Sequence, residues 1–154
     1  MCIRDSNLDD DDTLIGAAVT DGKQDILLAS NLGKMIRFNE KKVRPMGRTA
    51  RGVRGMKLPK KDSKVISMMV GEEEKTILCL SENGYGKKSR LEDFTLHNRG
   101  GQGVIALKTS ERNGLMVSAS SVTEDDGIML ISDCLLYTSP SPRDLSTSRM
   151  PSSA

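Results

Sequence analysis

Two short segments of this sequence place arginines among glycines, a combination suited to gripping phosphate. They are RGVRG at residues 51–55 and RGGQG at residues 99–103, and an apolar run follows each. The guanidinium group matches phosphate oxygens with planar, paired hydrogen bonds. Glycine adopts backbone conformations closed to other residues and lets a second molecule approach closely. The two segments therefore predict loops that touch a polyanion.

The remaining candidate residues form no constellation typical of catalysis or metal binding. His97 is the only histidine, and Cys79 lies in an apolar run that predicts a core position. The acidic run 72–74 lacks the glycine and spacing of a calcium loop, so we expect a solvated turn. No glycine loop followed by Lys-Ser or Lys-Thr occurs. We expect no catalytic residue, no metal ligand and no cofactor in this chain.

Composition favours one domain of ordinary size with an aliphatic core. The chain has 154 residues, of which 36% are hydrophobic and 3% aromatic. No run approaches the roughly 18 apolar residues that cross a membrane. The three cysteines give neither a disulfide framework nor a metal-ligand spacing, which favours a cytoplasmic location.

The two ends differ from the rest of the chain. Residues 134–154 are rich in serine and proline and show no apolar period, which is typical of a disordered tail. Both this tail and MCIRDS at residues 1–6 resemble translated sequencing-adapter DNA. We expect 1–6 to be a non-native leader and 134–154 an adapter-derived tail, with a genuine flexible tail as the alternative. Residues 7–133 are then the interpretable body.

The body repeats itself every 51 residues. Three apolar runs share this spacing: ILLAS (26–30), ILCLS (77–81) and IMLIS (128–132). Three further runs precede them at the same spacing: LIGAAV (from Leu14), VISMMV (from Val65) and MVSASS (from Met116). Turn residues follow, including the hairpin signal Asn83-Gly84. Short strands repeated at this period predict an all-β, propeller-like array in which the two runs of each unit pair across a short polar link.

Basic and acidic residues occupy different phases of this repeat. Residues 34–64 hold twelve Lys or Arg and two acidic residues, a net of +10, although the whole chain carries +2. Acidic residues gather at 9–12, 72–74 and 124–126. We expect basic loops from successive blades along one rim and acidic turns along another edge. Solvated surface charge without a partner is the alternative.

The polyanion that best fits such a rim is duplex DNA. Stacking on single strands needs exposed aromatic residues, and the body holds only Phe38, Tyr85 and Phe94. No recognition helix is visible in the sequence. Contact with duplex phosphates, indifferent to base sequence, remains.

Three segments carry a resemblance to a known family. They are GKMIRFNEKKVRPMGRTARGVRGMKL (33–58), NGYGKKSRLEDF (83–94) and RGGQGVIALKTSERNG (99–114), and they resemble the C-terminal domain of bacterial DNA gyrase A. In that family six such repeats form a β-pinwheel whose basic rim wraps DNA. The resemblance implies a partial β-pinwheel of about two and a half four-stranded blades. Asn98 and Gln102 stand where the family's signature box has Arg and Lys, so these units resemble later blades.

The resemblance also implies partners and site residues. The parent enzyme is a type II topoisomerase that introduces negative supercoils, with its active-site tyrosine, ATP and Mg in other domains, and with gyrase B and a second copy of gyrase A in a heterotetramer. For this chain it implies double-stranded DNA as partner. The candidate DNA-binding residues are Arg37, Lys41, Lys42, Arg44, Arg48, Arg51, Arg54, Lys57, Lys87, Lys88, Arg90 and Arg99.

Two alternatives remain open from the sequence. The paralogous protein of topoisomerase IV has related but more degenerate blades, whereas the Arg-Gly loops and ERNG (111–114) favour gyrase. A propeller that acts as a protein-interaction scaffold would display aromatic or apolar residues on a disc face, and the scarcity of aromatic residues weighs against it.

Overall fold

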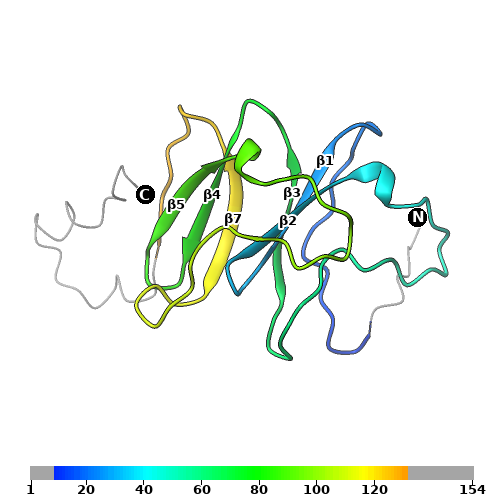
Figure 1. Ribbon diagram of the computed structural model, residues 1–154, viewed down its shortest axis with the longest axis horizontal. Coiled ribbons are helices and arrows are strands. Elements are labelled where there is room, and N and C mark those ends of the chain that lie inside the picture. Colours follow the sequence, from blue (N-terminus) through cyan, green and yellow to red (C-terminus); the bar gives the residue numbers. More distant parts are fainter. Residues whose placement is uncertain (1–8, 132–154) are drawn as a thin grey trace, which may run out of the picture.

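The computed structural model describes residues 9–131, which form strands joined by loops and two short 3-10 turns (Figure 1). The elements are β1 (Asp25–Ser30), β2 (Lys34–Asn39), η1 (Glu40–Lys42), β3 (Val65–Gly71), β4 (Thr76–Ser81), β5 (Gly86–Arg90), η2 (Leu91–Asp93), β6 (Val104–Ile105) and β7 (Met116–Val122). No α-helix occurs in this part of the chain. The expected all-β class is confirmed.

The strands form two antiparallel sheets. The first has four strands in the order β3-β1-β2-β6, and the second has three in the order β5-β4-β7. The second sheet repeats the first 51 residues later, since Ile26 pairs with Val70 and Ile77 pairs with Ser121. Each sheet also has a register shift at the same place, after Ala29 in one and after Leu80 in the other. The sequence repeat is therefore a repeat of strand pairing.

The expected pairing within each sequence unit is wrong. The acidic link 72–74 was expected to join paired strands, but β3 belongs to the first sheet and β4 to the second. A central strand has two edges. In each sheet one edge of the central strand takes its hairpin partner, and the other takes the first run of the next unit. Each sheet therefore begins in one sequence unit and ends in the following one.

Two of the expected strands are absent. Residues 14–19 and 128–131 are irregular, with Val19 99% exposed and Met129 83% exposed; Ser132 lies outside the described residues. The repeat assigns each of these runs a partner 51 residues before or after the modules seen here. A strand needs such a partner for its backbone hydrogen bonds, and residues 9–131 do not contain one.

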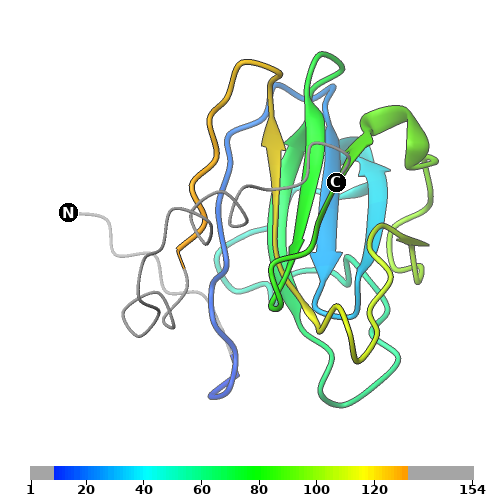
Figure 2. The same cartoon turned by 90° about the vertical axis from the view of Figure 1, so that its left-hand side faces the viewer.

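The first sheet is buried on both faces. Its inner face contributes Leu27, Ala29 and Met35 to a core shared with β4 and β7 of the second sheet. Its outer face carries Ile36 and Phe38, which the loop after η1 covers. Figure 2 shows the strands of both sheets running in the same general direction. Within residues 9–131 no helix has the length and apolar character of a membrane span.

Candidate nucleic-acid interface

The two Arg-Gly segments lie against each other. The Gly100 N–H donates to the Gly55 carbonyl at 2.7 Å, and the Lys57 N–H donates to the Gly101 carbonyl at 2.8 Å. These bonds join residues more than 40 positions apart in the sequence. The loop after η1 and the loop after η2 therefore form one surface, which the sequence alone did not predict.

The Arg99 side chain fastens this contact. Its Nε donates to the Lys42 carbonyl at 3.2 Å, and its Nη1 donates to the Arg54 carbonyl at 2.9 Å. Beside it, the Lys42 ammonium donates to the Asn98 side-chain oxygen at 3.0 Å. Only a planar fork of donors reaches two carbonyls at once. Arg99, expected to contact phosphate, thus has a positioning task within the protein.

Apolar side chains hold the basic loop on the sheet. Met56 is 6% exposed and packs with Ile36 and Phe38, while Val43 and Leu58 lie partly buried against the same cluster. These anchors were not among the sequence candidates. Their signal was available, because they are the apolar residues that interrupt the basic stretch. Burial of these side chains leaves the charged residues between them facing solvent.

The exposed cations of this loop form the main candidate surface, which we call the basic loop. It comprises Lys41, Lys42, Arg44, Arg48, Arg51, Arg54 and Lys57, all exposed. Within residues 9–131 the ion pair recorded for this group joins Arg51 to Asp9 at 3.9 Å, with both side chains 79% exposed. Such an exposed contact contributes little. The basic loop is therefore available to an anionic partner.

Arg37 lies apart from the basic loop. Its guanidinium pairs with Asp25 at 2.6 Å and donates to the Leu91 and Phe94 carbonyls at 3.1 and 3.3 Å. The side chain is 19% exposed. Arg37 therefore ties β1 and β2 to the η2 turn, and we leave it out of the candidate surface.

Three further candidates form a separate group on β5. Lys87, Lys88 and Arg90 are exposed. Figure 1 shows β5 and η1 at opposite ends of the molecule. The links that carry the acidic runs 72–74 and 124–126 both lie at the upper edge in that view. The candidates thus divide into the basic loop with Arg99, the β5 group, and the isolated Arg37.

The other chemically capable residues show no catalytic arrangement. His97 is exposed, and its Nε2 lies 2.8 Å from the Thr95 hydroxyl. Cys79 is fully buried, and burial raises the pKa of its thiol to about 11, so it stays protonated at neutral pH. Among residues 9–131 no three His, Cys, Asp or Glu side chains are placed to hold a metal ion.

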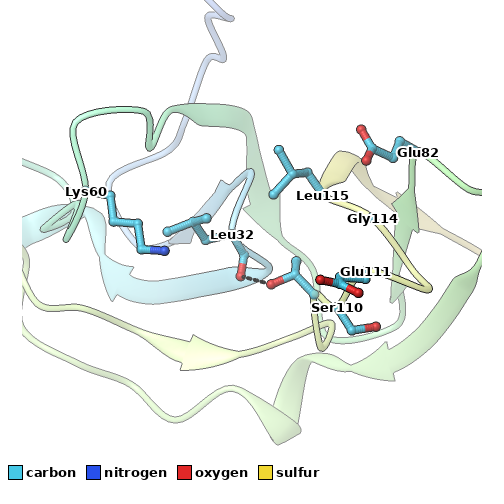
Figure 3. Close-up of a pocket in the computed structure, with 8 residues that line it drawn as sticks. Leu32, Lys60, Glu82, Ser110, Glu111, Gly114 and Leu115 are labelled. Atoms are coloured by element: carbon cyan, nitrogen blue, oxygen red, sulfur yellow. Dashed lines mark hydrogen bonds between the residues drawn. The ribbon is translucent and has the colours of Figure 1, made fainter.

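A shallow hollow lies between the turn after β1 and the segment before β7 (Figure 3). Its lining includes Lys60, Glu82 and Glu111, and the Thr109 hydroxyl donates to the Leu32 carbonyl at 3.3 Å. Two carboxylates beside one ammonium disfavour a phosphate ligand. The anion-binding candidates therefore remain those of the basic loop and β5.

Comparison with known proteins identifies the family. The family described as "DNA gyrase C-terminal domain, beta-propeller" matches residues 1–21, 24–71 and 75–123. The chain belongs to this family. DNA gyrase A of Pseudomonas aeruginosa is 53% identical over 126 residues, which cover 82% of this chain and 14% of that protein. DNA gyrase A of Salmonella typhimurium is 46% identical over 127 residues, again 82% of this chain and 14% of that protein.

Solved structures of the family share the fold. A DNA gyrase A C-terminal domain superposes with a TM-score of 0.71 at 31% identity, covering 79% of this chain and 41% of that one. The C-terminal domain of a DNA topoisomerase IV gives the same TM-score at 27% identity, covering 77% and 37%. The gyrase family predicted from the Arg-Gly segments is confirmed. The chain spans about one seventh of the length of the curated relatives.

Proposed function

We propose that this chain is a module of DNA gyrase A that binds duplex DNA through its phosphates and helps to bend it. The observation that carries the proposal is the basic loop, whose exposed cations are held in place by the contact between the two Arg-Gly segments. Seven cations on one anchored segment can neutralise several phosphates at once. Release of the DNA counterions then drives binding.

The distribution of aromatic residues supports duplex rather than single-stranded DNA. Phe38 and Phe94 are 3% and 2% exposed, so neither can stack on a base. Tyr85 is 39% exposed, but the Arg112 guanidinium already lies 5.2 Å from the centre of its ring. The same distribution argues against a scaffold that displays aromatic residues. Phosphate contact without base stacking is the mode that these side chains favour.

The role within the parent enzyme rests on family membership. We propose that the basic loop and the β5 group contact successive parts of one bent duplex, and that many phosphate contacts offset a bending cost of several kcal/mol. The bent segment would then be presented for strand passage in a cytoplasmic complex with gyrase B and a second copy of gyrase A. We assign ATP and Mg to other parts of that assembly.

The dependence of affinity on salt tests DNA binding. With five to seven phosphate contacts, the logarithm of the affinity for a 40-base-pair duplex should fall against the logarithm of salt concentration with a slope of about −4 to −6. Fluorescence anisotropy between 50 and 300 mM salt measures this slope. An affinity that does not change with salt would overturn the proposal.

Paired variants test the assignment of the basic loop. Arg51→Ala with Arg54→Ala should reduce the magnitude of the slope by about 2 and weaken binding equally on unrelated sequences. Lys75→Ala with Lys108→Ala removes the same charge outside the loop and should change the slope much less. Equal effects of the two pairs would indicate a general charge effect. Loss confined to one DNA sequence would indicate base readout.

A further inference from the structure

The outer edge of β5 is unpaired where the equivalent edge of β2 is covered. In the first sheet β6 pairs with β2, with Lys34 opposite Ile105 and Met35 opposite Val104. In the second sheet β5 is an edge strand, and no strand of residues 9–131 lies beyond it. An open edge presents unpaired backbone groups that can accept another strand.

The turns that lead into β2 and β5 have the same internal bonding. The Gly33 N–H donates to the Ser30 carbonyl at 3.0 Å, and the Gly84 N–H donates to the Ser81 carbonyl at 3.1 Å. Each serine hydroxyl also donates to the carbonyl four residues later, at 3.2 Å in both turns. The acceptor edge of β5 is therefore already shaped like the occupied edge of β2.

The two turn glycines differ in what surrounds them. Both have a positive φ, 75° at Gly33 and 84° at Gly84. A Cβ on Gly33 would overlap the Leu107 carbonyl, whose residue follows β6. A Cβ on Gly84 would meet no atom within 4 Å. The space that the segment after β6 fills beside Gly33 is thus open beside Gly84.

The Gly33 carbonyl shows how the incoming segment is held. It accepts the Ala106 N–H at 2.8 Å and the Leu107 N–H at 3.1 Å. No hydrogen bond within the described part of the chain reaches the Gly84 carbonyl. The equivalent acceptor therefore remains available.

We propose that the edge formed by Gly84, Tyr85 and Gly86 is a docking site for an extended segment of the type of residues 103–107, supplied by another module of the same repeat. In the register of the first sheet, the Ile105 position of the incoming segment lies opposite Tyr85 and the Val104 position lies opposite Gly86. The next two N–H groups donate to the Gly84 carbonyl. Such strand addition uses backbone bonds for affinity.

The incoming segment has a recognisable sequence. Its first residue is glycine, because a Cβ on Gly103 would overlap the Met35 carbonyl. Small and apolar residues follow at the positions of Ala106 and Leu107, which are 1% and 6% exposed in the core between the sheets. The pattern Gly-apolar-apolar-Ala-Leu distinguishes this occupant from an arbitrary extended peptide.

A synthetic peptide of residues 99–109 added to the full chain tests the site. We expect saturable binding, with amide chemical-shift changes and slowed hydrogen exchange at Gly84 and Gly86 and along the rest of β5. A peptide N-methylated at Ala106 cannot donate to the Gly84 carbonyl and should bind at least about tenfold more weakly. Equal binding of the two peptides, or of a scrambled peptide, would overturn the proposal.

A variant of the turn tests the open space. Gly84→Asn keeps a residue that tolerates positive φ but adds a Cβ where the incoming carbonyl would lie. It should reduce peptide affinity at least about tenfold. Gly22→Asn is the matched control, since Gly22 has φ 93° and also has no atom within 4 Å of a Cβ. Unchanged affinity in a folded Gly84→Asn chain would contradict the proposed geometry.

Disulfide trapping tests the register. Tyr85→Cys in a chain with Cys2 and Cys134 replaced by serine should cross-link to a peptide carrying Ile105→Cys, because opposed residues bring their Cβ atoms within disulfide range. Lys88→Cys lies three residues along the strand, about 10 Å away. It should cross-link much more slowly. Equal rates would show that the peptide does not dock in this register.

Discussion

A matched pair of glycine substitutions measures how tightly the two sheets are interlocked. Gly33 and Gly84 occupy equivalent turns with φ of 75° and 84°. Alanine at either position incurs the cost of a left-handed backbone conformation, about 1–2 kcal/mol. Only at Gly33 does the new methyl group overlap a backbone carbonyl, that of Leu107. The two variants therefore separate the backbone cost from the packing cost.

The additional cost at Gly33 follows from the hydrogen bonds at risk. Displacement of the segment after β6 strains the bonds from the Ala106 and Leu107 N–H groups, each contributing about 1 kcal/mol, and disturbs two buried side chains. We expect Gly33→Ala to lower the free energy of unfolding by about 3–4 kcal/mol and Gly84→Ala by about 1–2 kcal/mol.

Urea denaturation of the full chain, followed by circular dichroism, measures both free energies. The comparison requires equal slopes against urea concentration, so that each difference reports native-state stability. A Gly84→Ala chain that is destabilised as much as Gly33→Ala would refute the reasoning, because the backbone conformation alone would then account for both costs.

Three further outcomes are expected. Arg99→Lys should weaken DNA binding nearly as much as Arg99→Ala and speed hydrogen exchange at the Gly100 amide, since lysine keeps the charge but cannot reach both carbonyls; full activity of the lysine variant would contradict a positioning role. Asp25→Asn should cost about 1–3 kcal/mol in urea denaturation, against less than about 0.5 for the exposed control Glu72→Gln; equal costs would contradict the part-buried ion pair. Burial raises the Cys79 pKa from 9.0 to about 11, so between pH 9 and 11 the unfolded chain loses this proton first and stability should fall by up to about 2–3 kcal/mol; a Cys79→Ala chain with the same pH profile would contradict this assignment.

The repeat made most of the strands predictable. Apolar runs at a spacing of 51 residues located β1, β3, β4 and β7, and the Asn83-Gly84 pair located a hairpin turn. Such runs indicate that a segment is extended, but they carry no information on which segment pairs with it. The division of each sequence unit between two sheets could therefore not be predicted. The same limit explains residues 14–19, whose strand pattern is present without a partner among the described residues.

The candidate surface was predictable in its charge but not in its geometry. The basic stretch and the Arg-Gly segments indicated the loops correctly, whereas a count of charges cannot separate exposed arginines from paired ones. Arg37 joined the candidates because Asp25, twelve positions earlier, gave no sign of facing it. Arg99 was assigned to phosphate because its two carbonyl partners are backbone groups, which a sequence does not reveal.

The position of β6 affects how the chain is made. β2 ends at Asn39, but the strand that covers its outer side begins only at Val104. A ribosome that adds about 5–20 residues per second needs roughly 3–13 s for that interval. A hairpin forms within microseconds, so translation sets the time at which the first sheet closes. For those seconds a nascent β1–β2 hairpin remains open to pairing with neighbouring chains.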